Sequence, residues 1–127
     1  MFFFVHINKN LMNSIQELKK ELENKTLTVK WKVLCDIGPG WIGSSRTITF
    51  YLDKLQFEDT AFCNFMTNKL IEVMEIPSKS EDHVITGSGI FILQGADLII
   101  QYEIESNIPY DYEFNFDNGA KTFLTNI

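Results

Sequence analysis

Between Tyr110 and Asp117, aromatic side chains alternate strictly with acidic or amide side chains. Successive residues of a β-strand point to opposite faces of the sheet, so this pattern predicts a strand with one aromatic face and one acidic face. The run closes with Asn118-Gly119, a pair typical of two-residue turns, which predicts a hairpin into residues 120–125. A strand of this kind needs neighbours that cover its aromatic face, so the pattern indicates a sheet protein.

The rest of the chain divides into helical and alternating segments. Apolar residues recur at helical spacing in residues 14–25 and 57–75. Strict alternation predicts further strands at residues 27–35, 46–53, 83–93 and 97–105. We therefore expect an α+β fold, with a mainly antiparallel sheet of about five to seven strands and both helices packed on one face. We expect residues 1–127 to form a single domain.

Charge is distributed unevenly along the chain. The net charge is −6, but residues 1–54 carry eight bases and five acids, whereas residues 55–127 carry three bases and twelve acids. An acidic chain is repelled by phosphate backbones, which argues against nucleic-acid binding, and it should attract a basic partner. The apolar run at residues 2–7 is too short for a membrane span. Cys35 and Cys63 have no metal-ligand spacing, and they favour a reducing, cytoplasmic setting.

The predicted strand at residues 97–105 fixes how the acidic strand pairs with it. A five-residue loop aligns Ile104 with Tyr112 and Tyr102 with Phe114, and thereby keeps the apolar side chains on one face. The same register sets Glu105 opposite Asp111 and Glu103 opposite Glu113. Like charges in directly opposed positions are destabilising, so this face is either only solvated or kept for a cationic partner. The predicted partner-binding face consists of Glu103, Glu105, Asp111, Glu113 and Asp117.

Motifs that resemble catalytic or ligand sites lack the required context. Gly38-Pro39-Gly40-Trp41-Ile42-Gly43 matches a dinucleotide fingerprint, but a predicted strand follows it where the fingerprint needs a helix. We interpret it as a turn that presents Trp41. The acidic run that ends at Gly119 lacks the spacing of a calcium loop. His6 and His83 have no patterned nucleophile beside them. We therefore expect no catalytic residue, cofactor or metal, and we expect Trp41 and Tyr110 as possible aromatic anchors for a partner.

In size, acidity and absence of catalytic motifs, the chain resembles small acidic bacterial immunity or antitoxin proteins. That resemblance implies a non-enzymatic cytoplasmic protein that occludes a basic toxin domain, possibly a nuclease, through its acidic sheet face. Two other readings stay open. One is a small-ligand-binding or enzymatic domain with a pocket lined by Tyr102, Tyr112 and Phe114. The other is an oligomeric structural or interaction module in which the aromatic strand pairs across a dimer, so the sequence leaves monomer or homodimer undecided.

Overall fold

The computed structural model describes residues 11–34, 46–57, 60–78, 80, 83–108 and 114–127 of the chain. In these residues, two helices and an antiparallel sheet form the α+β fold that the sequence predicts. The elements are α2 (Leu11–Leu22), β1 (Leu27–Val33), β2 (Arg46–Leu52), β3 (Leu55–Phe57), α3 (Thr60–Met74), β4 (Val84–Gln94), β5 (Asp97–Asn107) and β6 (Phe114–Leu124). α2 starts and ends about three residues earlier than predicted, and α3 starts about three residues later than predicted. β3 is additional to the predicted strands.

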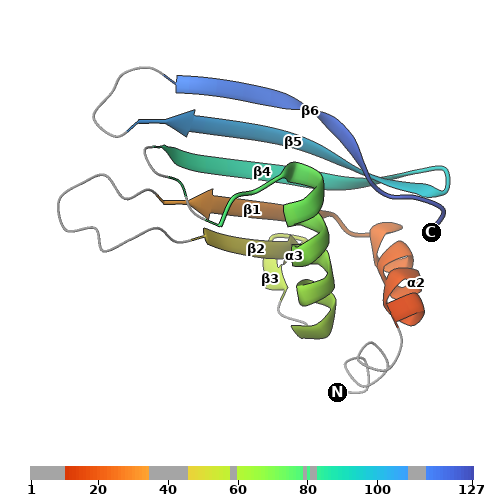
Figure 1. Cartoon of the computed structure of the whole chain (residues 1–127). Coiled ribbons are helices and arrows are strands. Elements are labelled where there is room, and N and C mark those ends of the chain that lie inside the picture. The colour runs from red at the N-terminus through yellow and green to blue at the C-terminus, as the bar shows by residue number, and fades with distance from the viewer. Residues whose placement is uncertain (1–10, 35–45, 58–59, 79, 81–82, 109–113) are drawn as a thin grey trace.

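The strands lie in the order β3-β2-β1-β4-β5-β6, and every neighbouring pair is antiparallel. Figure 1 shows this twisted sheet with α3 lying across one of its faces. A two-residue turn at Asp53-Lys54 joins β2 to β3, and both residues have positive φ, of 50° and 71°. Positive φ at both central positions is the geometry of the type I′ hairpin turn.

The core lies between the helices and the face of the sheet that they cover. Alternation along β1, which the sequence predicts for residues 27–35, places Val29 and Trp31 in this core and leaves Lys30 and Lys32 exposed on the other face. The buried apolar side chains are Leu18, Leu27, Val29, Trp31, Val33, Phe50, Phe62, Met66, Leu70, Met74, Ile76, Phe91, Leu98, Ile100 and Phe123. They come from both helices and from five strands, so one continuous core holds the described residues together.

The predicted hairpin at Asn118-Gly119 is wrong. Both residues lie inside β6, which continues as one strand to Leu124. Gly119 lies opposite Tyr102, and a Cβ at this glycine would approach the tyrosine hydroxyl oxygen to 3.0 Å. The glycine therefore accommodates a close side chain from the neighbouring strand instead of forming a turn.

The predicted register of β5 against β6 is also wrong. Ile104 lies opposite Asp117 instead of Tyr112, a displacement of five residues. Because the displacement is odd, each β6 side chain faces the side opposite to the predicted one. The observed register buries Phe123, which is 1% exposed and meets the Phe91 ring edge-on at a centroid distance of 4.8 Å. Burial of this ring against the core favours the observed register over the predicted one.

Candidate functional site

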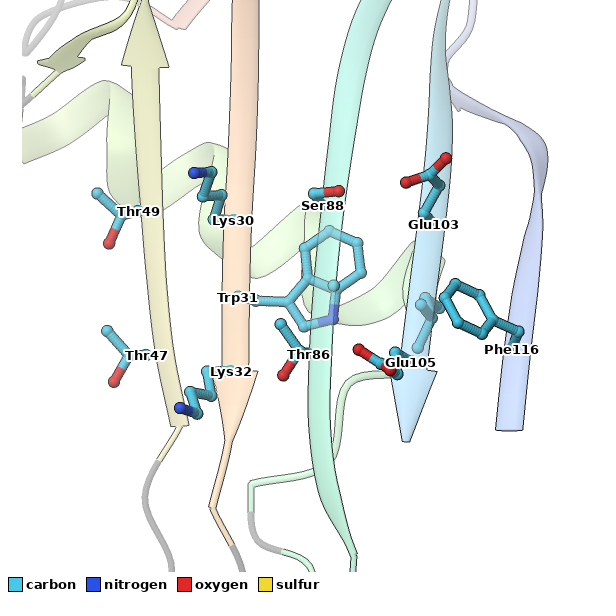
Figure 2. Close-up of a pocket in the computed structure, with 12 residues that line it drawn as sticks. Lys30, Trp31, Lys32, Thr47, Thr49, Thr86, Ser88, Glu103, Glu105 and Phe116 are labelled. Atoms are coloured by element: carbon cyan, nitrogen blue, oxygen red, sulfur yellow. The ribbon is translucent and has the colours of Figure 1, made fainter. Parts of the chain in front are cut away.

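The face of the sheet turned away from the helices, here called the open face, carries two rows of side chains, all polar except Phe116 (Figure 2). Each row crosses five strands, because residues in register on neighbouring antiparallel strands lie side by side on the same face. The first row is Thr49, Lys30, Ser88, Glu103 and Asn118, from β2, β1, β4, β5 and β6 in that order. The second row is Thr47, Lys32, Thr86, Glu105 and Phe116.

Charge on the open face is divided between two strands. Lys30 and Lys32 lie on β1, and Glu103 and Glu105 lie on β5, with only β4 between them. Two strand spacings separate these side chains at their Cα atoms by about 10 Å. Among the described residues, the ion pairs are Lys25–Glu21 and Lys69–Glu72, both on or next to a helix. These four charges are therefore not neutralised by direct contact with one another.

Hollows on the open face follow the two rows. One, of about 480 Å³, lies over the second row and is bordered by Lys32, Thr86, Glu105 and Phe116. The other, of about 700 Å³, lies beside it between Ile90 on β4 and Ala120 on β6. Lys30, Ser88 and Glu103 border both hollows, so together they form one groove across the sheet.

Large apolar side chains are exposed on the same face. Phe116 is 70% exposed and Phe114 is 56% exposed, and both point to the open face because they lie opposite Glu105 and Asn107. Ile90 and Ile92 are exposed on β4, two and four residues beyond Ser88. Apolar side chains grouped beside charged ones are typical of surfaces that bind other proteins.

The structure separates the residues of the predicted acidic face. Glu103 and Glu105 lie on the open face, but Asp117 lies opposite Ile104 and therefore belongs to the other face of the sheet. On β6, Glu103 lies opposite Asn118 and Glu105 lies opposite Phe116, so neither glutamate forms a like-charge pair with this strand. The remaining predicted site residues lie outside the described residues: Asp111, Glu113, Tyr110 and Trp41.

Sequence reasoning missed the basic side of this surface. Alternation does predict that Lys30 and Lys32 point outward, but it does not say which strands lie beside β1. Only the pairing of β1 with β4 brings these lysines within two strands of the β5 carboxylates. The predicted register places Phe116 on the buried face, whereas the observed register places it opposite Glu105 on the open face.

Two of the residues predicted to line an aromatic pocket, Tyr102 and Phe114, lie on opposite faces of the sheet, and the third, Tyr112, lies outside the described residues. Tyr102 points to the helix-covered side, whereas Phe114 points to the open face, so the two rings cannot line one cavity. Within the described part of the chain, no group of three or more His, Cys, Asp or Glu side chains is arranged to hold a metal ion. None of the described helices has the length and apolar character needed to cross a membrane.

Fold and surface together define an α+β protein with a helix-covered antiparallel sheet and an open, charged groove. The sequence matches no protein-family model and no curated protein, and the structure matches no solved structure. The geometry of the open face is therefore the basis for a functional assignment.

Proposed function

We propose that this chain is a non-enzymatic binding protein that takes a protein partner on its open face. The observation that carries the proposal is the juxtaposition, in one groove, of uncompensated charge with Phe116, an aromatic side chain that the fold leaves 70% exposed. An exposed aromatic ring beside charged residues is the usual composition of an energetic anchor in a protein interface.

The partner we propose is a basic domain, in the manner of a toxin blocked by its immunity protein in the cytoplasm. The chain has a net charge of −6, so it attracts a basic partner at long range. Glu103 and Glu105 would receive lysine or arginine side chains, while Lys30 and Lys32 would contact acids at one border of the same partner surface. Because the lysines and the glutamates lie on different strands, the partner can match both charges in one orientation only. An all-acidic face would not select an orientation in this way.

Co-expression with the product of the neighbouring gene, for which the proposal expects a basic domain, tests the proposal, followed by calorimetric titration of the purified pair at low and high salt. The variant E103K/E105K should weaken binding at least about tenfold, and high salt should weaken binding of the unaltered protein. The matched control is E23K/E72K, which makes the same change of charge just beyond the end of α2 and on α3, away from the open face.

Equal loss of affinity in both charge-reversed variants would show that only net charge matters and would contradict an assignment to the open face. A neighbouring gene for a metabolic enzyme, or a basic domain whose toxicity the chain does not reduce, would contradict the immunity function itself.

A further inference from the structure

The outer edge of β6 is a long strand edge to which no described strand is hydrogen-bonded. β6 is the last strand of the sheet, and its first seven residues are all exposed. Figure 1 shows it along the border of the sheet, opposite the short β3. An edge of this length presents a row of backbone N–H and C=O groups that can pair with another strand.

The charges of β6 are arranged symmetrically about its centre. Asp117 and Lys121 are its only charged residues, and each lies two positions from Gly119. All three have the same parity along the strand, so the aspartate and the lysine project from the helix-covered side of the sheet. A strand with this arrangement is complementary to an antiparallel copy of itself.

We propose that two copies of this chain pair through β6, antiparallel and centred on Gly119. In this register, Asp117 of each copy lies directly opposite Lys121 of the other, which gives two opposite-charge pairs across the seam. Registers centred on residue 117 or 121 would instead set two aspartates or two lysines against each other. The charge pattern therefore selects one register among those that the edge allows.

Contacts within the chain hold the Lys121 side chain on the helix-covered side of the sheet, against α3 and β5. Its Nζ donates to the backbone oxygen of Val73 at 3.4 Å and lies 5.8 Å from the centre of the Tyr102 ring. An ammonium group has three donors, so Nζ can donate to a carboxylate of a second copy in addition to these contacts. Asp117 is exposed.

The same register defines how far the paired edge extends. Phe116 lies opposite Thr122 of the other copy, and the ladder ends near Phe123, where β6 bulges against β5. A two-fold axis perpendicular to the sheet keeps both open faces on one side. The dimer thus places Phe116 beside the seam and covers part of a ring that is exposed in the single chain.

Sedimentation equilibrium of the full chain over a wide concentration range tests this pairing. The unaltered protein should form dimers, and D117K and K121D should each weaken dimerisation by roughly tenfold or more, because each sets like charges across the seam twice. The double variant D117K/K121D should restore the dimer. An equimolar mixture of D117K and K121D should form a heterodimer, since its two pairs are again of opposite charge.

Circular dichroism identifies variants that fail to fold, and D117K is the safer of the two because Asp117 is exposed. A monomer at all concentrations would overturn the proposal, and so would a dimer that neither reversal weakens. The outcome does not depend on the proposed function, because dimerisation is measured without any partner and titration with the basic domain is a separate measurement.

Discussion

Trp31 lies directly opposite Gly87 on the neighbouring strand, and its indole ring occupies the space that a Cβ at this glycine would need. The ring is 2% exposed and lies on the helix-covered side at the junction of β1 and β4. A glycine in mid-strand, which is normally unfavourable, here allows the largest side chain of β1 to lie flat against the next strand.

Substitution of this glycine should therefore be costly. G87A should lower the free energy of unfolding by about 1–3 kcal/mol, because the added methyl group overlaps a buried ring that has little room to move. Urea denaturation measures the loss, with T86A, exposed on the same strand, as the control. The smaller ring of W31F should recover part of the loss in the G87A background. No recovery would mean that the overlap is not the cause.

The two faces of β6 can be compared by truncating one phenylalanine on each. F123A should destabilise the protein by about 3–5 kcal/mol, because Phe123 is buried against Phe91. F116A should change stability by less than about 0.5 kcal/mol in the monomer, since its ring is mostly exposed. Chemical denaturation at low protein concentration distinguishes the two. A large loss in F116A would show that Phe116 is part of the core and not of a binding surface.

The residue that directly follows α3 has an unfavourable backbone conformation. Glu75 has a φ of 53°, and the N–H of Ile76 donates to the carbonyl oxygen of Ile71 at 3.1 Å, which is the pattern of a helix ended by a left-handed residue. E75G should raise the free energy of unfolding by about 1 kcal/mol, because glycine adopts this conformation without steric cost. E75A, which keeps a Cβ, is the control. A gain of equal size in both variants would point to removal of charge instead.

The turn between β2 and β3 offers a second test of the same kind at an exposed site. Lys54 has a φ of 71°, and reciprocal hydrogen bonds of 2.8 and 2.9 Å join the neighbouring Asp53 to Thr26, which lies just before β1. Asp-Gly is the preferred pair for such a turn, so K54G should raise the melting temperature, whereas K54A should not. A decrease for K54G would mean that the lysine side chain itself stabilises the turn.

Periodicity in the sequence was sufficient to predict the fold class and most of the elements, but not β3 or the continuous course of β6. The alternation of Val29 and Trp31 with Lys30 and Lys32 identified β1 and both of its faces correctly. Fold class follows from such local patterns, because burial of one face requires the same spacing wherever the strand lies in the sheet.

Register could not be predicted in the same way, because it depends on contacts between residues far apart in the chain. Asn118-Gly119 has the composition of a turn, but in the folded chain Gly119 lies in mid-strand opposite Tyr102. Only the burial of Phe123 in a core shared with α3 and β4 identifies the correct pairing. The candidate site depends on that register. Alternation along β5 is enough to place Glu103 and Glu105 on one face, whereas the face of Phe116 depends on how β6 pairs with β5.

The strand order also has a consequence for how the chain folds. β1, β2 and β3 pair with sequence neighbours, as do β4, β5 and β6, and only the β1–β4 pair joins the two sets. Each set can form as a local meander before the two dock, which avoids closing long loops early. Docking at β1 and β4 is then the step with the largest entropic cost. It is also the step that brings the lysines of one meander to the carboxylates of the other, so the groove arises only once both meanders have met.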